Sequence, residues 1–293
     1  MDIIMKKFRK CIEMYKTTKD IKIKETYGFD IMTYYEFFLS EEKVFNMDAI
    51  DDLIVDLKIN DSFFNSVLES FYNVSLESSD IFSKDEYLFI KDISKYIKID
   101  LINNNKIITD INLLNKYLKN TKFICDINDF FKYYNSKLNN SYYLNLINEK
   151  IIALSDRNIS TLVHEIVHGK VKKSKFDEFP SVFAECSLAT YYKLGDYFKR
   201  IKDIRDVQKS RLQKYNKLKK LYYLQLLKYS YSLLLSIAFI NNNGSDATNI
   251  DKIIEIVNEN TKSSVFKLLN ILNITEKDII TGMNNYKKIL TND

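Results

Sequence analysis

The sequence contains only two histidines, and both fall in the segment TLVHEIVHG, four residues apart. On an α-helix, side chains at this spacing lie one above the other, so His164 and His168 can present imidazole nitrogens to one metal ion. Glu165 is turned aside by about 100° and can reach a water on that metal. Asn158 is placed to cap the start of the helix. The HExxH spacing therefore predicts a zinc-binding helix; its alternative is a histidine pair packed on an apolar face.

Glycine and proline are rare, at five and one residues of 293, which permits long uninterrupted helices. Apolar residues recur three and four positions apart, for example Ile50, Leu53, Ile54 and Leu57. This periodicity predicts a mostly helical protein. Two short β-prone runs, SYYLNLI from Ser141 and KIIALS from Lys150, predict a hairpin or two strands directly before the HEIVH segment.

Near residue 141 the sequence changes from helical periodicity to short β-prone runs, which suggests that the chain has two parts. We expect an N-terminal helical lobe over residues 1–140 and a second region over residues 141–293, which contains the predicted zinc-binding helix and would be the catalytic region. Within the second part, we expect two final helices near residues 248–259 and 263–271, followed by a polar tail.

Charge and cysteine content limit the expected partners and compartment. The 44 basic and 39 acidic residues are interspersed and no nucleic-acid recognition motif accompanies them, so we expect no nucleic-acid partner. The N-terminal segment lacks an apolar core of signal-peptide length, which favours a cytoplasmic protein. Three widely spaced cysteines are typical of buried free thiols in a reducing compartment: Cys11, Cys125 and Cys186.

The segment Leu221–Ile240 approaches the length of a membrane span. It contains Gln225 and Lys228, and its tyrosines are distributed throughout instead of gathering at the two ends. We therefore predict a buried helix here and no membrane partner.

A catalytic zinc site requires a third protein ligand, which cannot be histidine in this chain. Nearby candidates are Asp177, Glu178, Glu185 and Cys186. Pro180 marks the start of a helix, which places Glu178 in or just before its first turn and Glu185 two turns further along the same face. We predict Glu178 as the third ligand, Glu185 as a hydrogen-bond partner of a ligand histidine, and Cys186 as a core residue.

The HEIVHG segment followed by Glu178, Ser181 and Glu185 resembles the thimet oligopeptidase and oligoendopeptidase F family of zinc metallopeptidases, whose pattern is HExxH and then E-x-x-S-x-x-x-E. Upstream, IIALSDRNISTLVHEIVH is similar to the family's edge strand, short loop and active-site helix. Downstream, LYYLQLLKYSYSLLLSIAFINNNGSD resembles its tyrosine-rich late helix. The resemblance covers residues 141–275, about half the chain.

The resemblance implies a mostly α, zincin-type (gluzincin-like) metallopeptidase fold with a small β-sheet beside the HExxH helix. The N-terminal helical lobe would be reduced, because family members are usually about twice as long. It also implies one Zn²⁺ per chain, held by His164, His168 and Glu178, and hydrolysis of peptide bonds in short or unfolded peptides. Glu165 would act as the general base on a zinc-activated water.

The resemblance further implies a tyrosine that stabilises the oxyanion. Tyr222 and Tyr229 have the spacing of the family's tyrosine pair, and Tyr231 is an alternative. The family's histidine ahead of this pair corresponds to Lys219. The strand at Ile151–Leu154 would pair with the extended backbone of a peptide substrate.

Two alternatives remain beside a general oligopeptidase. A reduced lobe could leave the cleft open to larger chains, as in a dedicated protease for one protein or leader-peptide substrate. The lysine at position 219 suggests instead a peptide-binding protein that retains zinc without turnover.

Overall fold

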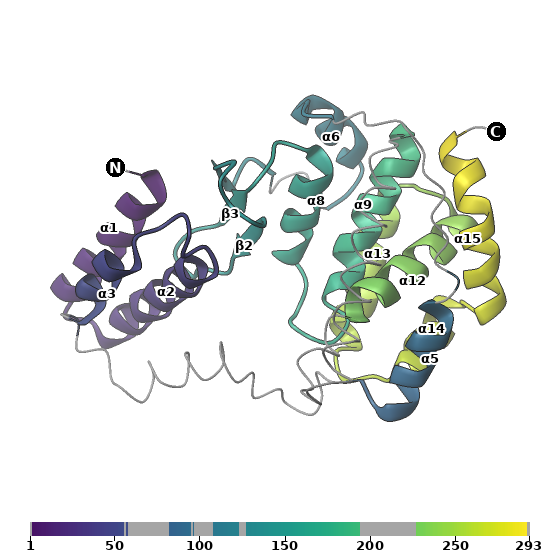
Figure 1. Ribbon diagram of the computed structural model, residues 1–293, viewed down its shortest axis with the longest axis horizontal. Helices are drawn as coiled ribbons and strands as arrows, with labels where there is room; N and C mark the ends of the chain where they lie inside the picture. The colour runs from purple at the N-terminus through teal and green to yellow at the C-terminus, as the bar shows by residue number, and fades with distance from the viewer. Residues whose placement is uncertain are drawn as a thin grey trace. The chain divides into compact units, whose positions relative to one another are not determined.

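The computed structural model describes residues 2–55, 57, 82–94, 96, 108–122, 127–193 and 227–291. These residues form α-helices and one small β-sheet, so the prediction of a mostly helical protein is confirmed (Figure 1). Contacts group the chain into two compact units: Met1–Ser75 with Asp126–Arg157, and Leu76–Cys125 with Asn158–Asp293. Each unit combines segments distant in sequence, and neither coincides with residues 1–140 or 141–293. The predicted domain boundary itself stays a prediction.

The helices of the first unit are α1 (Ile3–Thr17), α2 (Ile21–Ser40) and α3 (Met47–Val55). Aspartate side chains directly before α1 and α2 accept hydrogen bonds from first-turn amides, which otherwise lack partners within the helix. Between α1 and α2 lies an aromatic core in which Phe8 contacts Tyr34 and Phe38. Edge-to-face and tilted ring contacts of this kind stabilise a core beyond the area that they bury.

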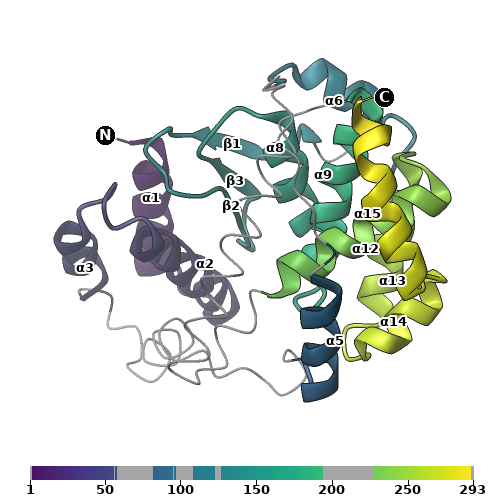
Figure 2. The ribbon, with the colours of Figure 1, turned by 45° about the vertical axis from the view of Figure 1, so that its right-hand side comes forward.

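The sheet of the first unit contains β1 (Phe131–Tyr134), β2 (Tyr142–Leu144) and β3 (Ile151–Leu154). β3 lies between the other two, parallel to β1 and antiparallel to β2 (Figure 2). The two strands predicted after residue 141 are therefore confirmed, whereas β1 was not predicted. The expectation that β3 is an edge strand open to a substrate is wrong, because strands of the chain itself pair with both of its edges.

The second unit is helical over its described residues. Its helices are α5 (Lys84–Ser94), α6 (Ile111–Leu118), α8 (Ile159–His168), α9 (Glu178–Tyr192), α12 (Leu227–Asn243), α13 (Thr248–Glu259), α14 (Val265–Leu272) and α15 (Glu276–Thr291). α9 packs against α8 on one side and α12 on another, and α12 also packs against α15 (Figure 1). This arrangement buries every residue of α9 from Glu178 to Ala189.

The C-terminal helices follow the sequence predictions in part. α13 and α14 lie where the last two helices were predicted. The polar tail expected after residue 271 is wrong, because α15 forms there and buries Ile279 and Met283. Gly282 of α15 allows a close approach to α12: a Cβ atom at this position would lie only 3.1 Å from Ala238 Cα.

Two expectations from composition can be compared with the described residues. Cys11 and Cys186 are buried free thiols, as predicted, and Cys125 lies outside the described residues. The described part of the apolar segment is the buried helix α12. None of the described helices combines the length and the apolar character that crossing a membrane requires.

Candidate metal centre

Helix α8 buries His164 and leaves His168, its last residue, half-buried. The Asn158 side chain accepts a hydrogen bond of 3.0 Å from Ser160 N, so the predicted N-cap is present. Every residue from Ile159 to Val167 is buried, and His164 and Glu165 are only 4% and 7% exposed. Polar groups at such depth normally have a partner or bind an ion.

The segment between α8 and α9 is short, and the side chain of Asn258 on α13 fixes its first half. Asn258 Nδ2 donates to Lys170 O at 2.9 Å, and Asn258 Oδ1 accepts from Lys172 N at 2.7 Å. One amide thus satisfies two backbone groups of the turn between the ligand-bearing helices.

Glu86 of α5 fixes the second half of the same segment. Its carboxylate accepts from the buried ammonium of Lys175 at 2.9 Å and from Val265 N at 2.6 Å. Burial raises the pKa of Glu86, but the Ser83 amide and Lys175 outweigh this and lower the pKa below its usual value. The segment that leads into α9 is therefore held by a buried ion pair.

Helix α9 begins at Glu178, with Pro180 in its first turn, as predicted. Proline is tolerated there because first-turn amides have no acceptor within the helix. Glu178 is 6% exposed, and Glu185, two turns later, is 0% exposed. Both carboxylates are thus presented inside the second unit.

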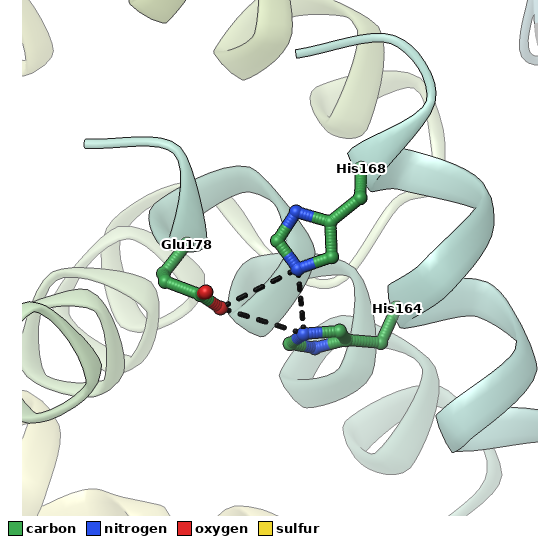
Figure 3. Close-up of side chains that lie close together, drawn as sticks. All are labelled: His164, His168 and Glu178. Atoms are coloured by element: carbon green, nitrogen blue, oxygen red, sulfur yellow. Dashed lines mark hydrogen bonds and ion pairs between the residues drawn. The ribbon is translucent and has the colours of Figure 1, made fainter. Parts of the chain in front are cut away.

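The two histidines and Glu178 converge (Figure 3). His164 Nε2 and His168 Nε2 are 3.0 Å apart, and Glu178 Oε2 lies 3.5 Å from each of them. Ligand atoms around a tetrahedral zinc, with bonds of about 2.0–2.1 Å, are separated by roughly 3.3 Å. Glu178 Oε2 is buried and has no hydrogen-bond partner among the described residues. The three donor atoms therefore fit a zinc ion.

Glu185 lies behind this cluster and faces the other nitrogen of a ligand histidine. Its Oε1 atom is 3.4 Å from His164 Nδ1. A carboxylate at Nδ1 favours the tautomer with a proton on Nδ1, which leaves the lone pair of Nε2 for a metal. This geometry supports the predicted supporting role of Glu185.

Opposite charges gather in the cluster. Burial alone lowers the pKa of His164, but Glu185 and Glu178 outweigh burial and raise it from 6.5 to about 10. Burial raises the pKa of Glu178, but His168 and Lys228 hold it well below its usual value. At neutral pH, the His164 ring is therefore protonated on both nitrogens, and a metal must displace the proton on Nε2.

We expect zinc binding at pH 7 to release about one proton per ion, because only a neutral imidazole can bind the metal. Zinc affinity should rise as the pH increases toward about 10, the pKa of His164 in the metal-free site. Calorimetric titrations in two buffers of different ionisation enthalpy measure the release. Glu185→Gln removes one charge that raises this pKa, so it should release fewer protons. Binding heats independent of the buffer would contradict the expectation.

The predicted tyrosines occupy different surroundings. The charge of Glu178, together with burial, raises the pKa of Tyr229 of α12 well above its usual value. Tyr231 is fully buried and packs against Phe82 and Phe176. The structure thus brings Tyr229, and not Tyr231, to the histidine–glutamate cluster. Tyr222 and Lys219 lie outside the described residues.

Lys228 is a residue of the site that was not predicted. Its Nζ atom lies 3.0 Å from Asp177 Oδ1 and 3.5 Å from Glu178 Oε1. Burial lowers the pKa of Lys228, but the two carboxylates outweigh this and raise it above its usual value. The available signal was that Lys228 is the one charged residue within Leu221–Ile240.

Comparisons with known proteins give one distant match. No family model matches the sequence, and no curated protein sequence matches it. A similar solved structure is that of a protein provisionally assigned as oligoendopeptidase F from Bacillus anthracis str. Ames. The two share 11% sequence identity and a TM-score of 0.48, over 98% of this chain and 70% of that chain. This similarity is a distant resemblance of fold and assigns no function.

Proposed function

We propose that this chain is a zinc-dependent peptidase that hydrolyses peptide bonds in short or unfolded peptides. The convergence of three donor atoms, from buried His164 and Glu178 and half-buried His168, at the spacing of a tetrahedral zinc site carries this proposal. A structural zinc site usually has four protein ligands, whereas a catalytic site has three and keeps one position for water or substrate. Three protein donors among the described residues therefore favour catalysis.

Glu165 is the proposed general base and acid. It follows the ligand His164 directly in α8, and its charge acts on both His164 and Tyr229. A zinc ion bound here would supply Lewis acidity toward the scissile carbonyl and make a water more acidic. Glu165 would accept the proton of the attacking water and transfer it to the departing amine.

Tyr229 is the proposed donor to the developing oxyanion. Its hydroxyl retains its proton, because the charge of Glu178 and burial both raise its pKa. A hydroxyl that stays protonated can donate a hydrogen bond to a carbonyl oxygen that gains negative charge. The charge of Glu165 also raises the pKa of this tyrosine and so favours its protonated form.

The proposal predicts about one zinc per purified chain and hydrolysis of a mixed peptide library that stops on chelation. Added zinc should restore both metal content and hydrolysis, as measured by elemental analysis and by mass spectrometry of the peptides. A library of short peptides and an unfolded protein, assayed in parallel, separates an oligopeptidase from a protease for larger chains. Stoichiometric zinc without cleavage would favour the peptide-binding alternative, and cleavage insensitive to chelation would refute the zinc mechanism.

A further inference from the structure

We propose that Lys228 is a positioning residue that holds one oxygen of Glu178, so that this carboxylate offers only its other oxygen to the metal. The inference rests on the proposed zinc site. Glu178 Oε2 lies 3.5 Å from both histidine Nε2 atoms, whereas Glu178 Oε1 lies 3.5 Å from Lys228 Nζ. The two oxygens of one carboxylate thus face different partners.

The position of Lys228 does not depend on Glu178 alone. Its ammonium is 3.0 Å from Asp177 Oδ1, and its side chain is only 24% exposed. The lysine comes from α12, whereas the ligands come from α8 and α9, and α12 packs along α9. A cation that is anchored by a second carboxylate can restrain the rotation of Glu178 in the way that a hydrogen-bonded partner usually orients a metal ligand.

The expected consequence concerns the number of bonds to the metal. A carboxylate that binds through both oxygens would occupy the position that a catalytic zinc leaves to water or substrate. Lys228 prevents this by occupying Oε1. As a cation, it also repels a metal ion, so its removal should not abolish metal binding as the loss of a ligand would.

Cobalt substitution tests the proposal without measuring catalysis. Co²⁺ in a four-coordinate site absorbs visible light more strongly than in a five-coordinate site, so its spectrum reports whether Glu178 binds through one oxygen or two. Lys228→Met, which keeps the length of the side chain and removes the ammonium, should weaken the absorption while Co²⁺ stays bound. Lys228→Arg should keep the parental spectrum, because a cation remains beside Oε1.

Two further variants serve as controls. Lys173→Met removes one positive charge from an exposed position in the segment between α8 and α9 and should leave the spectrum unchanged. Glu178 also interacts electrostatically with Tyr229, so Tyr229→Phe tests whether the tyrosine is the group that holds the carboxylate. Parental absorption in Lys228→Met, or a change in Tyr229→Phe alone, would overturn the role of Lys228.

The experiment separates this inference from the proposed function. If the parent protein binds neither Co²⁺ nor zinc, the metal site itself is refuted, and the role of Lys228 is refuted with it. If the parent binds Co²⁺ and Lys228→Met has the same spectrum, only the positioning role fails. Circular dichroism of each variant verifies folding, and Lys228→Gln provides a second neutral variant, with the same expected loss of absorption, if methionine prevents folding.

Discussion

Glu165→Gln should lower peptide hydrolysis by several orders of magnitude, with ~10²–10⁴-fold from lost proton transfer alone, and leave the zinc content unchanged. Glutamine has nearly the shape of glutamate, so it can fill the same buried position in α8 without a cavity. It cannot accept the proton of an attacking water. Since His164 and His168 remain, the metal should stay bound at parental affinity within a few fold.

The measurement compares kcat/KM and zinc content of parent and variant on one cleaved peptide. Glu255→Gln is a matched control, because it makes the same chemical change at an exposed position of α13 that pairs with a surface lysine. This control should hydrolyse the peptide at the parental rate. Parental turnover in Glu165→Gln would exclude Glu165 as the base.

Glu178→Ala should lose zinc at neutral pH, whereas Glu185→Ala should bind zinc ~10–100-fold more weakly than the parent. The two variants should differ in zinc affinity because the two carboxylates lie at different distances from the atoms that would bind the metal. Glu178 Oε2 lies 3.5 Å from both histidine Nε2 atoms, so its loss removes one of three donors. Glu185 Oε1 faces His164 Nδ1 at 3.4 Å, so its loss removes only the group that orients this imidazole.

Competition with a chromophoric chelator measures both affinities at the same pH. Glu178→Gln tests whether charge is required, because it keeps an oxygen near the histidines. If Glu185→Ala loses zinc and Glu178→Ala retains it, the assignments of ligand and supporting residue are exchanged. If both variants bind zinc with the parental affinity, neither carboxylate contributes to zinc binding.

The features predicted correctly from sequence depend on short-range geometry. Helical periodicity brings His164 and His168 to one face, and Pro180 fixes the helix start that presents Glu178. The prediction of a polar tail after residue 271 was wrong because it relied on local helix propensity alone. α15 contains glycine and asparagine, which have low helix propensity, but packing of its apolar residues against α12 outweighs that preference.

Features that depend on partners distant in sequence were missed. The pairing of β3 with β1 is parallel and involves a connection through β2, so a local strand pattern could not reveal that β3 is central. Lys228 reaches Asp177 across 51 positions of sequence. Its isolated charge in an apolar helix marked it as unusual, but only the packing of α12 along α9 identifies the carboxylates beside it.

Consecutive residues of α12, Lys228 and Tyr229, both interact electrostatically with Glu178, and the same helix is packed between α9 and α15. Helices move as rigid bodies when a protein opens or closes around a ligand. A displacement of α12 would therefore withdraw the cation and the tyrosine from Glu178 in a single step. The electrostatic surroundings of Glu178 would then depend on the packing of α12, so a mutation that loosens the α12–α15 contact, far from the histidines, would reduce turnover while the metal stays bound.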